Sequence, residues 1–185
     1  MTCIVAIADK SGVYMGGDSA GVGGLSITVR DDVKVFHNGD FLIGGTTSFR
    51  MLQLLQYRLN PPKQGHKQTD MEYMVNDFID AVRRCFAEGG WGKASGHDNN
   101  EGGNFLVGYN GVLYEIFGDF QVAKPSLQYS ACGCGEDLAL GSLYTSVGQK
   151  PEARLKKALE AATHFSAGVS APYVYLKQLK VKTKK

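Results

Sequence analysis

Three residue types that together support nucleophilic hydrolysis stand near the start of the chain at regular spacing. Thr2 is the second residue, Asp18 follows it by 16 residues, and Lys34 follows Asp18 by another 16. A threonine hydroxyl is a weak nucleophile and needs a base. If Met1 is removed, the freed α-amine of Thr2 stands on the same residue as the hydroxyl. Its ordinary pKa of about 7.7–8.0 makes the neutral base accessible near neutral pH.

The other polar residues in this part of the chain would tune and complete such a site. A lysine ammonium at Lys34 would lower the pKa of the amine, and Asp18 would hold that lysine charged and oriented. Backbone N–H groups at Gly44 and Gly45 would stabilise an oxyanion, since glycine permits a tight turn and close approach of a substrate. We therefore expect Thr2 as both nucleophile and base, with one of the two glycines as oxyanion donor.

A predicted hairpin would bring the first two of these residues together. Residues 3–8 and 13–17 read as strands around a short polar turn. A two-residue loop pairs positions whose numbers sum to 21. This register sets Thr2 opposite Ser19 and beside Asp18.

A second predicted hairpin positions the lysine. The Asn38-Gly39 dipeptide is a strong turn signal between strands at 33–36 and 41–43. With these two residues as the loop, paired positions sum to 77. Lys34 then faces Ile43, immediately before the glycine pair.

The rest of the pattern favours helices in pairs between groups of strands. Helices are predicted over 49–59, 70–86, 136–147 and 151–165, and further strands over 25–29, 105–109, 112–116, 127–131 and 173–181. The Gly-rich stretch 21–24 is predicted as a link, and 87–104 as a surface loop. Because strands and helices do not alternate, antiparallel sheets are expected. We predict an α+β fold, a four-layer α-β-β-α sandwich of two antiparallel sheets covered by helix pairs, in one domain over 1–185 with a basic tail at 182–185.

Composition excludes several other classes of protein. Hydrophobic residues make up 43% and charged residues 21%, with a net charge of +2, which is ordinary for a globular protein and does not call for a nucleic-acid partner. No apolar run approaches the roughly 20 residues that cross a bilayer, and the start lacks the features of a signal peptide. The four cysteines, at positions 3, 85, 132 and 134, follow no disulfide or zinc pattern. We expect a cytoplasmic protein with no membrane partner, cofactor or metal.

Several segments of the chain resemble the proteasome β-subunit and HslV family of N-terminal-nucleophile hydrolases. The segments that carry the resemblance are Thr2–Ile7, Gly17-Asp18-Ser19, Val33-Lys34-Val35 and Gly44-Gly45-Thr46, and Gly133-Cys134-Gly135 looks like the family's Gly-Ser-Gly segment. The resemblance covers about residues 2–176 and is specific in the first 50. It implies a threonine endopeptidase whose Thr2 hydrolyses polypeptide substrates inside a homo-oligomeric, possibly stacked, ring. It also implies that an AAA+ ATPase unfoldase is a possible partner.

Two positions depart from the family pattern. Cys134 stands where the family has a hydroxyl that supports the amine, and a thiol is a weaker hydrogen-bonding group. His164 falls where many members carry an aspartate. Two alternatives therefore stay open beside an active peptidase: a catalytically silent proteasome-like ring scaffold, and a related amidohydrolase acting on a small amide.

Overall fold

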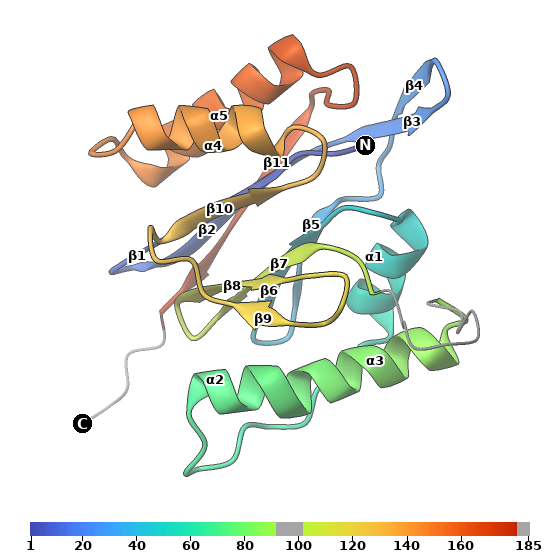
Figure 1. The fold of residues 1–185 in the computed structure, drawn as a ribbon, viewed down its shortest axis with the longest axis vertical. Coiled ribbons are helices and arrows are strands. Elements are labelled where there is room, and N and C mark those ends of the chain that lie inside the picture. The colour runs from blue at the N-terminus through green and yellow to red at the C-terminus, as the bar shows by residue number, and fades with distance from the viewer. Residues whose placement is uncertain (92–101, 181–185) are drawn as a thin grey trace.

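Four layers build the molecule, and the polar residues singled out above lie at one end of them. The structure, a computed structural model, describes residues 1–91 and 102–180. Two antiparallel sheets stack face to face, and a layer of helices covers the outer face of each sheet (Figure 1). The predicted α+β class and α-β-β-α sandwich are confirmed.

The first sheet has four strands in the order β10-β1-β2-β11. Its strands are β1 (Ile4–Asp9), β2 (Gly12–Asp18), β10 (Tyr129–Cys132) and β11 (Tyr173–Leu179). Helices α4 (Glu136–Thr145) and α5 (Pro151–Phe165) cover its outer face. Pro151 stands in the first turn of α5, where its missing N–H costs nothing.

The second sheet has five strands in the order β5-β6-β7-β8-β9. Its strands are β5 (Val35–Asn38), β6 (Phe41–Gly45), β7 (Phe105–Tyr109), β8 (Val112–Ile116) and β9 (Val122–Ala123). Helix α1 (Phe49–Tyr57) and the run α2 (Asp70–Tyr73), η1 (Met74–Phe78) and α3 (Ile79–Glu88) cover its outer face. Residues 70–86 were predicted as one helix; the helix extends to residue 88 and contains a π-helical segment at η1.

Alternating side chains along β1 bury both faces of that strand. Ile4, Ala6 and Ala8 pack between the two sheets, in one cluster with residues of β2 and of the second sheet. Cys3, Val5 and Ile7 point the other way, into the cluster formed with α4 and α5. A continuous apolar strand therefore fixes the start of the chain, including Thr2, in the middle of the first sheet.

The predicted register of the first hairpin is confirmed, whereas the second is off by two residues. In β1 and β2, Asp9 pairs with Gly12, and every pair sums to 21. In β5 and β6, Asn38 pairs with Phe41, so the pairs sum to 79 instead of 77. The loop is Gly39-Asp40, with Gly39 at a φ of +54° in its first position, where a type II′ turn places glycine. A shift of two keeps every side chain on its predicted face.

The Gly-rich stretch predicted as a link is instead a strand. Strands β3 (Ala20–Gly23) and β4 (Ser26–Val29) form a separate two-stranded hairpin beside the N-terminus. The short edge strand β9 was not predicted either. In the described parts of the chain, no helix is long and apolar enough to cross a membrane.

Candidate active site

Thr2 lies just before β1 at the edge of a small cavity. Its side chain is largely buried, at 5% exposure, and it lines a cavity of about 110 Å³ together with Lys34. Met1 is attached in this structure, and the Thr2 hydroxyl donates to the carbonyl oxygen of Met1. The other lining residues are Met1, Val22, Thr46, Thr47, Ser48, Phe49 and Leu52.

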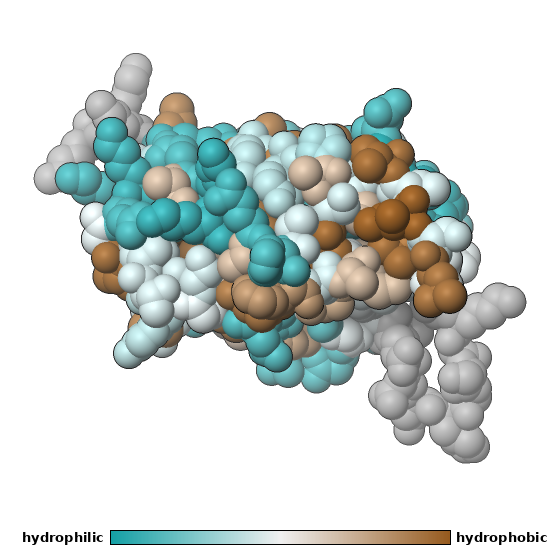
Figure 2. Space-filling model, turned by 90° about the horizontal axis from the view of Figure 1, so that it is seen from above, coloured by the Kyte–Doolittle hydropathy of each residue, from teal (hydrophilic) through white to brown (hydrophobic). Residues whose placement is uncertain are grey.

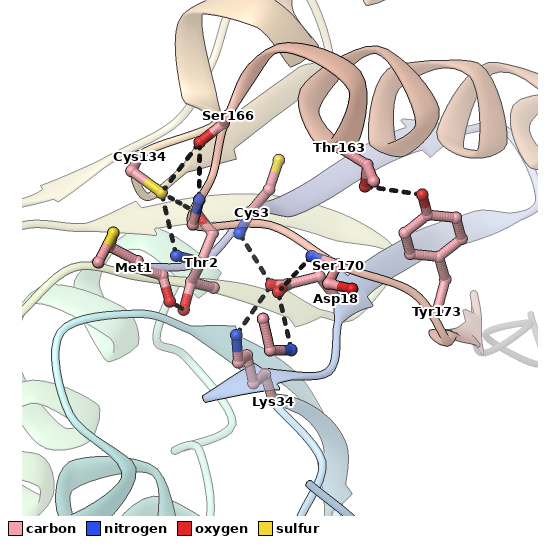
Figure 3. A network of polar contacts seen from close by, with 12 residues as sticks. Met1, Thr2, Cys3, Asp18, Lys34, Cys134, Thr163, Ser166, Ser170 and Tyr173 are labelled. Carbon is pink, nitrogen blue, oxygen red and sulfur yellow. Dashed lines mark hydrogen bonds and ion pairs between the residues drawn. The ribbon is translucent and has the colours of Figure 1, made fainter. Parts of the chain in front are cut away.

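A buried ion pair lies beside Thr2. Lys34 Nζ donates to Asp18 Oδ1 at 2.9 Å, and both side chains are excluded from solvent. Asp18 also accepts from the backbone N–H groups of Cys3 and Ala20, each at 3.0 Å, and of Ser170 at 3.4 Å. These bonds satisfy the carboxylate from several directions, as a buried charge requires. Figure 3 shows Thr2 between this pair and Cys134.

Burial controls the electrostatics of the lysine. Removal from solvent lowers the pKa of the Lys34 ammonium, and the charge of Asp18 opposes that effect. The net result is that the pKa of Lys34 is lowered from its ordinary value. An ammonium held 2.9 Å from a carboxylate nevertheless stays a local positive charge beside Thr2.

Cys134 contacts the Thr2 nitrogen, which would be a free amine once Met1 is removed, as the resemblance implied for this position. The Thr2 backbone N–H donates to Cys134 Sγ at 3.3 Å, and the thiol in turn lies 3.5 Å from the Thr2 carbonyl oxygen. Gly133 makes this approach possible, because it has a φ of +104° and any Cβ there would collide with the Thr2 carbonyl.

The residue that sequence reasoning missed at this point is Ser166. Its hydroxyl lies 3.5 Å from Cys134 Sγ and accepts from the Gly168 N–H at 3.4 Å. His164, two positions earlier, is exposed in the last turn of α5, and its ring packs edge-on against the Phe165 ring. A small hydroxyl directly after the helix was the available signal in the sequence.

The glycine pair lies in the sheet, with its amides directed into the strand pairing. The Gly45 N–H donates to the Lys34 carbonyl oxygen at 3.1 Å, so it is not a free oxyanion donor here. Gly44 pairs with Leu106 of β7, the side to which alternation directs its N–H. Side chains at both positions would collide with buried neighbours, Met15 for Gly44 and Leu52 for Gly45. The glycines therefore permit close packing around the site.

One backbone amide that stays free near the cavity belongs to Thr47. Within residues 1–91 and 102–180, the Thr47 N–H donates to no acceptor, while its Oγ1 accepts from the Asn104 N–H at 3.3 Å. Thr47 has a φ of +72°, which is unusual for a β-branched residue. Strained backbone of this kind persists where surrounding contacts enforce it and is frequent at functional sites.

Cys3 can be set aside as a competing nucleophile. It follows Thr2 directly but is fully buried, and burial raises the pKa of its thiol to about 12. A thiol that stays protonated is a poor nucleophile.

Among the described residues, no group of three acidic, cysteine or histidine side chains could hold a metal ion. A larger cavity of about 670 Å³ lies at the Gly39-Asp40 turn and has no part of Thr2, Asp18 or Lys34 in its lining.

Several solved structures of known proteins are similar to this chain in fold. No protein-family model matches the sequence, and no curated protein matches it. The solved structure of Thiobacillus denitrificans BPH in complex with epoxomicin is similar to this chain with a TM-score of 0.78, covering 97% of this chain and 100% of that chain at 15% identity. Eukaryotic HslV from Trypanosoma brucei is similar with a TM-score of 0.66, covering 95% and 98% at 17% identity.

A third similar structure is the helical assembly of the Anbu complex from Pseudomonas aeruginosa, with a TM-score of 0.65. It covers 95% of this chain and 80% of that chain at 17% identity. Sequence identity this low supports a shared fold and leaves activity to be argued from the site. The chain therefore has the fold of the proteasome-like and HslV-type N-terminal-nucleophile hydrolases, as its first fifty residues predicted.

Proposed function

We propose that the chain is a proteasome-like threonine peptidase subunit in which Thr2 is the nucleophile after Met1 has been removed. The observation that carries the proposal is the buried Asp18–Lys34 pair next to a threonine at the start of the chain. Burying a lysine and an aspartate at the edge of a cavity costs the desolvation of two charges, which favours a chemical role for the pair.

Removal of Met1 creates the base. The Thr2 nitrogen, now 3.3 Å from Cys134 Sγ, becomes a primary amine on the same residue as the hydroxyl. The positive charge of Lys34 lowers the pKa of that amine, which favours its neutral form. The neutral amine takes the proton of the hydroxyl as Oγ1 attacks the carbonyl carbon of a peptide bond. With Met1 attached the nitrogen is an amide and cannot act as base.

The N–H of Thr47 is the donor that we assign to the developing oxyanion. It donates to no acceptor among the described residues, and it belongs to a residue of the cavity lining. A preorganised donor of this kind contributes a factor of about 10²–10³ to kcat.

The remaining steps return the protons. The protonated amine gives its proton to the leaving nitrogen, and the peptide carbon–nitrogen bond breaks to leave an ester on Thr2. The amine then takes a proton from water, whose oxygen attacks the ester. As the second tetrahedral intermediate collapses, the bond from the carbon to Oγ1 breaks and the amine returns its proton to Oγ1, which releases the acid product and restores the threonine hydroxyl.

We further propose that the active form is a homo-oligomer; the similar Anbu structure is described as a helical assembly. The β3–β4 hairpin supports an interface, because Leu25, Ile27 and Val29 are exposed there. Figure 2, seen from the side of α4 and α5, shows hydrophobic side chains gathered toward the end where this hairpin lies. An AAA+ ATPase unfoldase stays a possible partner, since a closed chamber would admit only unfolded chains.

The test pairs an intact-mass measurement with covalent labelling. The purified protein is expected to lack Met1, and an epoxyketone such as epoxomicin, the ligand of the BPH structure, is expected to add to Thr2. Thr2→Ala should abolish labelling and peptide hydrolysis, whereas Thr145→Ala, a matched change within α4, should leave both unchanged. A Met1-free protein that assembles but neither labels nor cleaves would show a silent scaffold. Cleavage of small amides alone would show an amidohydrolase.

A further inference from the structure

We propose that Cys134 is a site of reversible oxidation, and that its oxidised sulfur forms a covalent bond with the amine of Thr2, which switches the active site off. The inference rests on the proposed function, because it needs the amine that removal of Met1 creates. The Thr2 N–H donates to Cys134 Sγ at 3.3 Å, so the nitrogen and the sulfur are already in contact (Figure 3).

The thiol of Cys134 is accessible to a small oxidant. Cys134 is exposed, whereas the other three cysteines of the chain are buried. Met1 packs beside it, because a Cβ at Gly168 would lie 2.6 Å from Cys134 Sγ and 2.6 Å from Met1 Cβ. Removal of Met1 therefore uncovers the sulfur further. Susceptibility of a cysteine to peroxides follows exposure and thiolate character, so Cys134 is the thiol of this chain that an oxidant reaches first.

The amine of Thr2 is the nucleophile best placed to react with an oxidised Cys134. A sulfenic acid condenses with a thiol to form a disulfide, or with a nitrogen to form a sulfenamide. Burial raises the pKa of the Cys3 thiol to about 12 and that of the Cys132 thiol well above its ordinary value. Both thiols stay protonated and are poor nucleophiles. The amine, in contrast, keeps a free lone pair near neutral pH, because the cation of Lys34 lowers its pKa.

The bond forms in two balanced steps. Hydrogen peroxide or another hydroperoxide oxidises the Cys134 thiol to a sulfenic acid and is itself reduced, by hydrogen peroxide's loss of one oxygen atom to water. The lone pair of the Thr2 nitrogen then attacks the sulfur, the sulfur–oxygen bond breaks, and the hydroxide leaves as water with one proton of the amine. A small thiol reverses the step: its sulfur attacks Cys134 Sγ, the sulfur–nitrogen bond breaks and the nitrogen regains a proton. A second thiol reduces the mixed disulfide.

The backbone around the two groups favours this bond without a change of fold. Cys134 lies in the turn between β10 and α4, and Thr2 precedes β1, so neither group is held within a helix or strand. The Gly135 N–H donates to the Thr2 carbonyl oxygen at 3.3 Å, which keeps the two segments side by side. The Ser166 hydroxyl, 3.5 Å from Cys134 Sγ, is in place to bond the oxygen of the sulfenic acid. Movement of one side chain and of the chain end is enough to close the contact.

The bond removes the base of the active site. A nitrogen joined to sulfur no longer serves as the amine that takes the proton of the Thr2 hydroxyl, and the hydroxyl is a weak nucleophile without a base. General-base catalysis contributes a factor of about 10²–10⁴ to the rate. Fully crosslinked protein is therefore expected to hydrolyse peptides about a hundredfold more slowly or worse.

Intact-mass analysis of the Met1-free protein before and after treatment with hydrogen peroxide tests the bond. We expect the mass to fall by about 2 Da, because two hydrogens are lost when the sulfur–nitrogen bond forms, and peptide mapping to join Thr2 to Cys134. Peptide hydrolysis should fall with the crosslinked fraction, and both changes should be reversed by dithiothreitol. A gain of oxygen on Cys134 without a crosslink, or full activity in crosslinked protein, would overturn the inference.

Cysteine variants separate this bond from other oxidation. Cys134→Ser should form no crosslink and should keep its own starting activity in peroxide. Cys3→Ala and Cys132→Ala, made separately, should still crosslink; loss of the crosslink in either variant, with its starting activity intact, would show a disulfide instead. Cys85→Ala removes a buried thiol of α3 and is the matched control, which should respond to peroxide as the wild type does.

The same measurements distinguish the two proposals. A Met1-free protein that crosslinks but hydrolyses no peptide before oxidation refutes the proposed function alone. An active protein that forms no crosslink refutes the oxidation site alone. A protein that keeps Met1 has no free amine on Thr2 and refutes both.

Discussion

Removing the charge of Asp18 while keeping its shape is a direct test of the ion pair. Asp18→Asn would leave the ammonium of Lys34 buried without its carboxylate partner. It would also set an amide NH₂ group among backbone donors, since the carboxylate accepts from Cys3 and Ala20 at 3.0 Å and from Ser170 at 3.4 Å. Both consequences oppose folding and disorder the support of Thr2.

The magnitude follows from the burial of the pair. Breaking a buried ion pair by removing one partner costs about 3–5 kcal/mol. Most domains have about 5–15 kcal/mol of total stability, so the variant is expected to fold but to unfold at a much lower urea concentration. Lys34→Met should also cost several kcal/mol, because it leaves Asp18 charged. In the double variant neither charge is left alone, and we expect a loss smaller than the sum of the two single losses by about 1–3 kcal/mol.

The assay is equilibrium urea unfolding of the wild type, both single variants and the double variant, with activity measured on the same samples. Asp32→Asn is the matched control. Its ion pair with Arg30 is partly exposed, and such pairs contribute only about 0–1 kcal/mol. Additive losses in the cycle, within about 0.5 kcal/mol, would refute the claim that Asp18 and Lys34 stabilise each other. A full-rate Asp18→Asn enzyme would refute its role in the site.

Four further predictions concern the groups around Thr2. Lys34→Met should move the acidic limb of the kcat/KM profile to higher pH, because loss of a nearby cation raises the pKa of the amine; an unmoved limb would remove Lys34 from amine tuning. The wild type should also gain stability relative to Lys34→Met as pH rises from the lowered folded-state pKa of Lys34 toward about 10.4, since the unfolded chain then binds the extra proton; pH titration of urea midpoints measures this. Cys134→Ser should keep or raise activity and Cys134→Ala should lower it, because a hydroxyl bonds the amine more strongly than a thiol; the reverse order in peptide hydrolysis would contradict the assigned contact. Iodoacetamide at pH 8 should alkylate exposed Cys134 and spare Cys3, whose thiol pKa is raised to about 12; peptide mass spectrometry locates the adducts.

Short-range turn chemistry explains which parts of the site could be predicted. The β1–β2 register was correct because a two-residue polar loop between apolar strands leaves one arrangement that buries both faces. The β5–β6 register was off by two because Gly39 opens the turn instead of closing it. That error left Lys34 on the correct face, since strand side chains repeat every two residues.

Long-range contacts explain what could not be predicted. Ser166 reaches Cys134 across 32 residues, and the Ser170 N–H reaches Asp18 across 152. Nothing in the local sequence of either residue specifies such a partner. The same holds for Thr47, whose positive φ accompanies a bond from Asn104, a residue 57 positions later.

The sequence by itself determined that Thr2 would lie beside Asp18 and Lys34 beside the glycine pair, because two hairpins fix those positions through local pairing. The contact between Lys34 and Asp18 depends on the stacking of the two sheets that hold these hairpins. It also determined the layered α+β fold, because strand and helix periodicities are local properties. Only the tertiary structure decided which groups surround Thr2: Cys134 and Ser166 on one side, the cavity walls of Val22 and Leu52 on the other, and a free Thr47 N–H in place of the glycine amides. The physical reason is that packing between distant segments decides which side chain or amide is left free, and no pairing rule within a hairpin specifies it.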